Sequence, residues 1–551
     1  MLVPALFGNL YWSHTFHLVN LYVAVAVLQN MLLADAGQVS FGQGAVFGAA
    51  GYTVGIAATL LGTSLPLAFL LGLAAALALG CLFALPALRV QGYYLGFVTL
   101  SVAMVFPELL VAFSDYTNGV NGIKLQLPAL HRPLFAGVTP LSLLVILLAC
   151  GALAGHGYLR ETRLGRRMRV AAASPEAALS LGFSPGGARS AAFFIAALGT
   201  GLAGLLYVPV VGFLSPSAFH VELSIFFFFS VIVGGNGRLL GPILGVWILY
   251  LVPNVLMVDL VNYRLIGYGL VALGIMLAFP DGLVGTVENA LRRRTLKPGD
   301  AEVGLQSVMG AAGAADKAPP SAGAAIVEVR AARKRYGQVV ALDGVSLTVG
   351  RGTVHGLVGP NGSGKTTLLN VLSGFARLDA GAVSIKGVGI ARMRPDRIAR
   401  LGVGRTFQTP RVFDELTIAE NVQIGADVAG TRVDDVDPKW RTQRPDQLPH
   451  AQRRLLEVLR VIRTGSDVLL LDEPAAGLSA EERREFARLL RHLRDALGKT
   501  IVLVEHDLDL VWRVADRITV LDTGTTIAEG APAEIVGDAR VRALFTGKLD
   551  A

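Results

Sequence analysis

The first 88 residues of this 551-residue chain contain no lysine or arginine. Charged residues make up only 16% of the sequence and hydrophobic residues make up 53%, whereas soluble proteins carry about a quarter charged residues. The shortage is concentrated in the first half, because basic and acidic residues are dense after Leu291. This asymmetry excludes a wholly soluble protein, and the length predicts two or three domains.

Cysteine is nearly absent, since the chain has only Cys81 and Cys150, each within an apolar run. This count argues against a disulfide framework or a cysteine metal site, and we expect both residues in the core. The nine histidines are scattered, and we find no Ser/His/Asp nucleophile set and no metal-ligand cluster. The N-terminus also lacks the basic residues that begin a secretory signal.

What the first half does contain is a series of long apolar segments. A helix needs about 20 apolar residues to cross the ~30 Å of hydrocarbon in a bilayer. The nine candidate segments are 16–34, 41–62, 64–88, 93–113, 140–159, 190–214, 221–235, 239–257 and 264–279. They predict an all-α, polytopic membrane domain over residues 1–297. Segment 41–62 is glycine-rich and is the candidate for a partly re-entrant segment, and 221–235 is short.

The formal net charge of +8 arises largely beside these segments. Basic residues cluster at 160–169 and 292–297, where the positive-inside rule places them on the cytoplasmic side. This location favours membrane orientation over nucleic-acid binding, and we expect no nucleic-acid partner. With residues 160–189 in the cytoplasm, alternation of the nine segments leaves the N-terminus outside.

A short helix is predicted within this cytoplasmic stretch, from Ser174 to Gly182. Serine is a good N-cap, Pro175 suits the first helical position, and glycine suits the stop. An ordinary loop helix is one interpretation. Docking onto a cytoplasmic partner is the interpretation that the preceding basic run favours.

The second half has a different character. Residues 298–325 are rich in alanine, glycine and proline, which predicts a flexible tether. Over residues 326–551, strand-like and helix-like runs alternate, as is typical of an α/β domain with a mostly parallel sheet. Residues 359–367 read GlyProAsnGlySerGlyLysThrThr between a strand-like run, 354–358, and a helix-like run, 365–372. This context identifies a P-loop, which binds nucleotide phosphates.

The chemistry of the P-loop assigns roles to its residues. Backbone amides near Lys365 face the phosphates, the Lys365 amine approaches the β- and γ-phosphates, and the Thr366 hydroxyl binds Mg²⁺. The expected nucleotide-binding residues are Gly359, Pro360, Asn361, Gly362, Ser363, Gly364, Lys365, Thr366 and Thr367.

Three further strand ends and Tyr336 supply the remaining site candidates. Asp472 and Glu473 end an apolar run, where we expect Asp472 to hold Mg²⁺ and Glu473 to polarise the attacking water. His506 follows another apolar run and is placed to sense a γ-phosphate. Gln408 follows 403–407 and is a candidate for contact with Mg²⁺ or the water. Tyr336 precedes the P-loop and is a candidate for stacking on adenine.

Together these residues resemble the nucleotide-binding domain of ABC transporters, with the P-loop as Walker A, 468–473 as Walker B, Gln408 as the Q-loop and His506 as the switch histidine. AspGluProAlaAlaGlyLeu at 472–478 and ValGluHisAspLeu at 504–508 resemble the ATPase subunit of branched-chain amino acid importers. The membrane half resembles the matching permease subunit, and the segments that carry this likeness are 36–44, 233–245 and 279–285. The resemblance covers nearly the whole chain apart from the tether, and two usually separate subunits look fused.

This resemblance implies a multi-pass protein of the bacterial inner membrane with a cytoplasmic ATPase domain that uses ATP and Mg²⁺. Its implied partners are a second permease subunit, a second ABC ATPase subunit and an extracytoplasmic substrate-binding protein. The implied substrates are branched-chain or other hydrophobic amino acids, although related permeases carry urea or other small amides. By position, segment 174–182 matches the coupling helix that relays closure of the ATPases.

The sequence departs from the family in two places. The signature that contacts the partner's ATP, usually LeuSerGlyGlyGln, is replaced by Leu448, Pro449, His450, Ala451 and Gln452. Ala451 adds a methyl group where backbone meets phosphate, so we expect the composite site that uses this signature to be slow. Only 39 residues separate Gln408 from Leu448, which predicts a reduced docking surface.

Two other functions remain open from the sequence. An ABC exporter half-transporter is also a fused membrane–ATPase chain, although exporters resemble six long helices rather than many short, glycine-rich segments. A membrane-bound regulatory ATPase is compatible with the altered signature. The leading hypothesis is the fused permease–ATPase half of an ATP-driven importer, with ATP hydrolysis coupled to transport.

Overall fold

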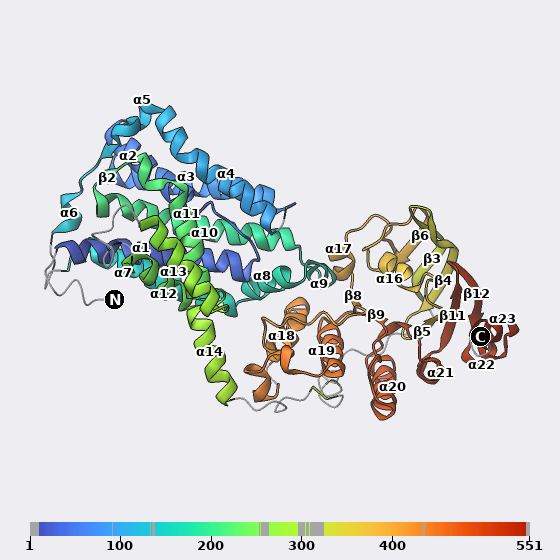
Figure 1. The fold of residues 1–551 in the computed structure, drawn as a ribbon. Helices are drawn as coiled ribbons and strands as arrows, with labels where there is room; N and C mark the ends of the chain where they lie inside the picture. The colour runs from blue at the N-terminus through green and yellow to red at the C-terminus, as the bar shows by residue number, and fades with distance from the viewer. Residues whose placement is uncertain are drawn as a thin grey trace. The chain divides into compact units, whose positions relative to one another are not determined.

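The computed structural model describes residues 10–90, 92–132, 134, 138–252, 254, 264–295, 303–304, 308, 324–433 and 436–546. These residues form two compact units (Figure 1). The helical unit comprises Met1–Ala172 and Pro185–Lys297, and the α/β unit comprises Ala173–Ser184 and Pro298–Ala551. Segment Ala173–Ser184 therefore packs with the α/β unit, although it lies inside the membrane domain 1–297 that the sequence predicts.

The helical unit consists almost entirely of apolar helices. They are α1 (Leu10–Asn30), α2 (Gln43–Thr59), α3 (Leu65–Ala87), α4 (Tyr93–Ala112), α5 (Ser114–Thr117), α6 (Pro128–His131), α7 (Pro140–Glu161), α8 (Arg163–Ala173), α10 (Pro185–Val211), α11 (Val221–Gly234), α12 (Gly241–Leu251), α13 (Arg264–Ala278) and α14 (Gly282–Thr295). A π-helical turn, Met31–Asp35, extends α1, and the short strands β1 (Ile123–Lys124) and β2 (Phe213–Leu214) pair antiparallel. Each of the nine predicted segments is helical over most of its described residues.

Seven helical stretches among the described residues are long and apolar enough to span a membrane. They include α1, α3, α4, α7 and α10; the other two are Pro216–Gly234 and Gly269–Leu291, which begin before α11 and within α13. Helix α2 has 17 residues, at the lower end of the range for a spanning helix, and α12 has 11 among the described residues, so neither is among these seven.

Close helix packing in this unit depends on small residues. A Cβ atom placed on Gly80 of α3 would lie 2.2 Å from the Ala197 Cβ of α10, and one on Gly72 would lie 2.7 Å from the Ala50 carbonyl oxygen of α2. Glycine at these positions allows the backbones to approach, which is the usual way that membrane helices associate.

The prediction that the two cysteines are core residues is wrong. Cys81 of α3 and Cys150 of α7 are both exposed. Leu82 and Leu85, beside Cys81 on α3, are also exposed. A helix that faces lipid is as apolar as one that faces the protein interior, so an apolar run alone does not place a side chain in the core.

The α/β unit contains two sheets. The strands are β3 (Ala325–Tyr336), β4 (Val339–Gly350), β5 (Val354–Val358), β6 (Ala380–Ile385), β7 (Val388–Gly389), β8 (Val403–Arg405), β9 (Val468–Asp472), β10 (Thr500–Val504), β11 (Arg517–Asp522) and β12 (Thr525–Gly530). The six-stranded sheet has the order β12-β11-β5-β10-β9-β8 and is parallel except for β12, and the antiparallel sheet has the order β4-β3-β6-β7. Strands β5, β9 and β10 are buried along their whole length, as expected for a parallel sheet covered on both faces.

The same unit contains helices, which Figure 1 labels. They are α9 (Pro175–Ser180), α16 (Lys365–Leu372), α17 (Pro395–Arg400), α18 (Ile418–Ala429), α19 (His450–Arg463), α20 (Ala480–Asp495), α21 (Leu508–Val514), α22 (Pro532–Gly537) and α23 (Ala539–Thr546), with 3-10 turns at Pro438–Arg441 and Pro445–Gln447. The predicted strand 354–358 and helix 365–372 are confirmed. The fold class, an all-α membrane part followed by an α/β P-loop domain, is confirmed.

Helix α9 forms as its sequence predicts. The Ser174 hydroxyl accepts a hydrogen bond from the Ala177 amide at 3.2 Å, and Gly182 has a φ of +83°, which ends the helix. The segment packs on α17, where Arg400 Nε donates to the Gly182 carbonyl at 2.8 Å. It also reaches Arg411, which lies 3.3 Å from Glu176. Arg400 lies outside the short stretch between Gln408 and Leu448 that predicted a reduced docking surface, and Arg411 lies near the start of that stretch.

Two described residues of the predicted tether, Val303 and Val308, are fully buried in the hydrophobic core of the α/β unit. The Val303 amide also donates to the Gln452 side chain at 3.2 Å. At these two positions, the segment predicted as a tether contributes apolar side chains to the core of the α/β unit.

Candidate functional site

The P-loop lies between β5 and α16 and depends on two glycines. Gly359 has a φ of +153°, and a Cβ there would lie 2.1 Å from the Leu521 carbonyl oxygen. Gly364 has a φ of +101°, and its Cβ would lie 2.5 Å from the Ala341 carbonyl oxygen. Only glycine fits both the backbone conformation and the space. The loop is thus held close to neighbouring backbone while its amides remain available.

Lys365 begins α16 and is buried. Its Nζ donates to the carbonyls of Gly359 and Pro360, each at 2.8 Å, and lies 3.4 Å from the Ser363 hydroxyl. Burial lowers the pKa of the Lys365 amine, and Glu473 and Asp472 oppose that shift. The amine is therefore fixed across the loop, in the place where phosphate oxygens bind in a P-loop.

Asp472 ends β9 and is 1% exposed. Its amide donates to the Thr406 hydroxyl at 3.0 Å, and its Oδ2 lies 4.0 Å from Arg405. Its Oδ1 is buried with no hydrogen-bond partner among the described residues. Burial raises the pKa of Asp472. A buried carboxylate oxygen without a partner fits a Mg²⁺ ligand, because hard cations prefer such oxygens and offset the desolvation.

Glu473 and His506 meet at the carboxyl ends of two adjacent parallel strands. Strands β9 and β10 pair with Asp472 opposite Val504, so the residues that follow them are neighbours. His506 Nε2 lies 2.7 Å from Glu473 Oε1. Glu473 has a φ of +49° and donates its amide to the Val504 carbonyl at 2.9 Å. Such a backbone is rare outside glycine and is typical of functional positions.

Glu505 is a buried residue of this site that the sequence analysis did not single out. Its side chain accepts hydrogen bonds from the Ala475 amide at 2.7 Å and the His506 amide at 3.2 Å. Burial raises the pKa of Glu505 to about 7. The residue fixes the two loops that carry Glu473 and His506, and its position beside His506 was the available signal.

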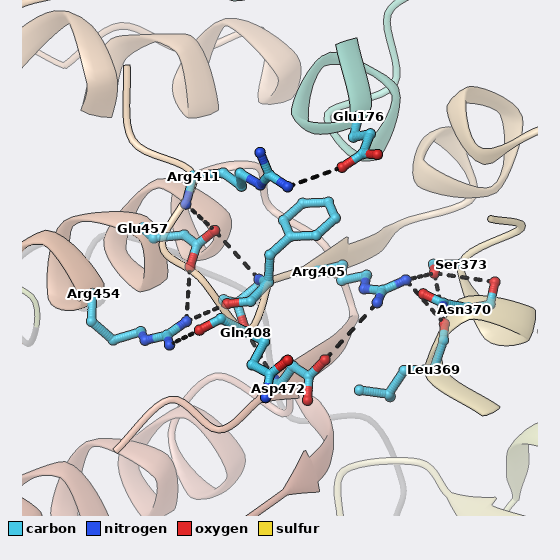
Figure 2. A network of polar contacts seen from close by, with 12 residues as sticks. Glu176, Leu369, Asn370, Ser373, Arg405, Gln408, Arg411, Arg454, Glu457 and Asp472 are labelled. Carbon is cyan, nitrogen blue, oxygen red and sulfur yellow. Dashed lines mark hydrogen bonds and ion pairs between the residues drawn. The ribbon is translucent and has the colours of Figure 1, made fainter. Parts of the chain in front are cut away.

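The Q-loop is held by a buried ion pair on the signature helix α19 (Figure 2). Arg454 donates to the carbonyls of Phe407 and Gln408. Glu457, 3.4 Å from Arg454, accepts from the amides of Phe407 at 3.4 Å and Arg411 at 3.1 Å. Both side chains are at most 1% exposed. We call Arg454 and Glu457 the α19 clamp.

Figure 2 also shows how this clamp continues to its neighbours. Arg411, whose amide the clamp holds, pairs with Glu176 of α9. Arg405 lies beside Asp472 and donates to the Ser373 hydroxyl, and its guanidinium stands 5.2 Å from the Phe407 ring centre. The Q-loop backbone is thus connected to α9, to α19 and to the neighbourhood of Asp472.

The remaining candidates are placed less centrally. Gln408 is fixed through its backbone and its side chain is exposed. Tyr336 ends β3, is 49% exposed, and has the Lys334 amine 5.2 Å from its ring centre. Thr366 is exposed and Thr367 is half-buried on α16. A cavity of about 280 Å³ is lined by Gly359, Pro360, Asn361, His506, Leu544 and Phe545, so it joins the P-loop to His506. The two α23 residues carried no sequence signal.

The altered signature forms the start of α19. Leu448 is buried, Pro449 is the N-cap position and His450 is the first helical residue. Ala451 is half-buried and packs against the hydrophobic core, so its methyl group is partly covered by residues of this same chain. Gln452 accepts the hydrogen bond from Val303.

Comparison with known proteins covers both units. Residues 13–280 match the family "Branched-chain amino acid transport system / permease component", and residues 342–476 match the family "ABC transporter". The chain is 32% identical over 250 residues to the high-affinity branched-chain amino acid transport ATP-binding proteins LivG of Salmonella typhimurium and BraF of Pseudomonas aeruginosa, covering 40% of this chain and 98% of each relative.

Other matches also concern the ATP-binding part. The sulfate/thiosulfate import ATP-binding protein CysA of Mycolicibacterium paratuberculosis is 37% identical over 221 residues, covering 38% of this chain and 60% of that protein. The crystal structure of the ADP conformation of MJ1267, an ATP-binding cassette of an ABC transporter, is 29% identical, covers 41% of this chain and all of its own, and has a TM-score of 0.37. The chain therefore belongs to the branched-chain amino acid transport family of ABC transporters, and it joins a permease and an ATP-hydrolysing ABC ATPase in one polypeptide.

Proposed function

We propose that this chain is the fused permease–ATPase half of an ATP-driven importer of branched-chain or related hydrophobic amino acids in the bacterial inner membrane. One observation carries the proposal. Segment Ala173–Ser184 belongs to the permease in sequence, yet it packs on α17 and pairs with Arg411 of the Q-loop. The names of the relatives LivG and BraF support the substrate class, since both are branched-chain amino acid transport proteins.

The nucleotide is ATP with Mg²⁺. Residues 359–367 hold the phosphates, Lys365 exchanges its loop carbonyl partners for phosphate oxygens, and Tyr336 stacks on adenine. Asp472, Thr366 and Gln408 are the residues that would hold Mg²⁺, and the unpartnered Asp472 Oδ1 is the feature that fits it best. Mg²⁺ held by these residues would neutralise the negative charge that develops on the phosphates during hydrolysis.

Hydrolysis depends on Glu473. Its carboxylate orients the attacking water and accepts a proton from it. His506, 2.7 Å away, keeps the carboxylate in place and approaches the γ-phosphate when nucleotide binds. The site is completed by the signature of a second ABC ATPase, while residues 448–452 of this chain complete the partner's site.

Coupling follows the contacts in Figure 2. A change at the Q-loop alters the position of Arg411, whose side chain pairs with Glu176. Helix α9 then moves with the ATPase and transmits the motion to α8 and α10, which flank it in the chain. A second permease subunit and an extracytoplasmic binding protein complete the transporter.

Reconstitution tests this proposal directly. The chain would be placed in proteoliposomes with the second permease, the second ATPase and the binding protein, and uptake of labelled leucine would be measured with and without Mg-ATP. We expect uptake that depends on ATP and on the binding protein. Glu473→Gln should abolish most ATP turnover, while Glu481→Gln, an exposed acid on α20, should leave it intact.

Other outcomes would identify the rival functions. ATP-dependent movement in the opposite direction without a binding protein would indicate an exporter. ATPase activity without any movement of amino acid would indicate a regulatory ATPase. Near-normal turnover in Glu473→Gln would contradict the expectation that the composite site using residues 448–452 is the slower of the two.

A further inference from the structure

The helical unit contains a cavity of about 340 Å³ lined by Gln38, Tyr93, Tyr94, Ala172 and Arg189, together with glycines. Its size lies at the lower end of the range for small-molecule sites, which is about 300–1,000 Å³. Gln38 follows the π-helical end of α1, the tyrosines begin α4, and Arg189 lies in the second turn of α10. Ala172 directly precedes Ala173, the first residue of the segment that packs with the ATPase. The lining of the cavity therefore includes the residue that directly precedes segment Ala173–Ser184 in the chain.

Arg189 is an unusual residue for this place. Its side chain is 4% exposed and its Nε is buried without a hydrogen-bond partner. Among the described residues, no carboxylate and no carbonyl pairs with its guanidinium, in contrast to Arg160 of the same unit, which lies 3.2 Å from Asp35. Because a largely buried cation without a partner is costly, an anionic group from outside the chain would be stabilised beside Arg189. A guanidinium binds a carboxylate or a phosphate through paired hydrogen bonds.

Gln38 distinguishes among anions. Its Nε2 donates to the carbonyls of Ala36 and Gly37, each at 3.1 Å, which fixes the orientation of the amide. Its Oε1 is buried and accepts no hydrogen bond from the described residues. The cavity thus combines an unpaired cation with an unpaired acceptor. A simple carboxylate satisfies only the first of these groups, because it has no hydrogen-bond donor for Gln38 Oε1.

We propose that this cavity binds the zwitterionic head of a free α-amino acid on its path through the permease. The α-carboxylate pairs with Arg189, the α-ammonium donates to Gln38 Oε1, and the aromatic rings of Tyr93 and Tyr94 cover an apolar side chain. This assignment rests on the proposed function for its substrate class, and it names a specific residue for each charged group. An ordered phosphate, free or from a lipid headgroup, is the other source of an anion for Arg189.

Binding to the purified full-length chain tests the site. Labelled L-leucine would be titrated into the chain held in nanodiscs of phosphatidylcholine and, separately, in nanodiscs of phosphatidylglycerol. Competition would use 3-methylbutylamine, which lacks the carboxylate, 4-methylpentanoate, which lacks the ammonium, and inorganic phosphate. We expect each analogue to compete at least about tenfold more weakly than leucine, since a hydrogen bond to a charged group is lost. Phosphate and the lipid headgroup should have little effect.

Variants assign the two groups. Arg189→Gln should weaken leucine about tenfold or more and should also weaken 4-methylpentanoate. Arg189→Lys should recover part of this loss, and Ser190→Ala, a half-buried neighbour on α10, should bind as the natural chain does. Gln38→Leu should weaken leucine and leave 4-methylpentanoate unchanged. A purely structural role for Gln38 would weaken both ligands equally.

The failures can be told apart. Leucine binding that is unchanged in Arg189→Gln overturns the site and leaves the proposed function standing. Arg189-dependent binding of a different α-amino acid supports the site and refutes the proposed branched-chain substrates. Equal competition by phosphate, loss of leucine binding in phosphatidylglycerol alone, or no binding of any amino acid overturns the site, and the uptake assay then decides the function independently.

Discussion

The α19 clamp gives the sharpest prediction. Replacing Arg454 with methionine keeps a side chain of similar length but removes the donors to the carbonyls of Phe407 and Gln408. Glu457, which is fully buried, is left with Arg460 at 3.8 Å as its remaining cation. We expect the Q-loop to lose its fixed conformation and the ATPase unit to lose stability.

The magnitude follows from burial. Breaking one partner of a buried ion pair costs about 3–5 kcal/mol, because the other charge stays buried. For a domain of this size, that loss lowers the unfolding temperature by about 6–20 °C. The neighbouring Arg453 is the matched control. It pairs with Asp414 at 2.9 Å, but both side chains are partly exposed, and such pairs contribute at most about 1 kcal/mol.

The assay is thermal inactivation of Mg-ATP binding in the purified full-length chain, read with a fluorescent nucleotide. Arg454→Met should be inactivated at a clearly lower temperature than Arg453→Met. ATP hydrolysis should also fall in Arg454→Met below the level that its remaining nucleotide binding explains. Equal inactivation temperatures for the two variants would refute the reasoning, because they would show that the buried ion pair stabilises the ATPase unit no more than the surface ion pair does.

The remaining predictions concern the site residues. Because the pKa of Glu505 rises on folding from 4.5 to about 7, the folded state holds more protons between these values, and the free energy of unfolding should fall by about 3 kcal/mol as the pH rises through them. Glu505→Gln keeps an acceptor but cannot ionise, so its unfolding temperature at pH 5 and pH 8 should differ less than in the natural chain; an equal difference would exclude this group as the cause. Gly359→Ala should destabilise the unit several times more than Gly362→Ala, because a Cβ on Gly359 would lie 2.1 Å from a carbonyl oxygen, whereas a Cβ on Gly362 would have no atom within 4 Å. At Gly362 only the cost of the left-handed backbone, about 1–2 kcal/mol, remains. Unfolding of both variants without nucleotide measures the difference. Glu176→Gln should leave the unfolding temperature nearly unchanged, because its pair with Arg411 is exposed, yet it should lower amino acid uptake relative to ATP turnover, and unchanged coupling would remove that pair from the relay.

The nucleotide site could be predicted where its signals are local. A P-loop requires a strand, glycines and a helix in sequence, so residues 354–372 specify it without knowledge of the rest. Strands β9 and β10 are mainly apolar, and this pattern predicted that Glu473 and His506 follow strands. Their pairing as neighbours required the sheet order, which no local pattern contains.

The α19 clamp could not be predicted for a physical reason. Arg454 and Glu457 are three residues apart on a helix, a spacing that usually indicates an exposed ion pair. Their burial depends on the Q-loop covering them, and the loop is 46 or more residues away along the chain. The prediction that the two cysteines are buried was wrong for a related reason, because lipid-facing and interior-facing positions of membrane helices have similar residue compositions.

The chain passes between its two units at residues 172–173, 184–185 and 297–298. The segment that contains helix α9 is thus covalently part of the permease but contacts Arg400 and Arg411 of the ATPase. We expect that cleavage of the peptide anywhere from 309 to 323 would not release the ATPase as a free fragment, because this segment would remain bound to it. A gene split at that point should yield two polypeptides that copurify. The covalent fusion would then set equal numbers of permease and ATPase domains, and it would not be required to hold them together.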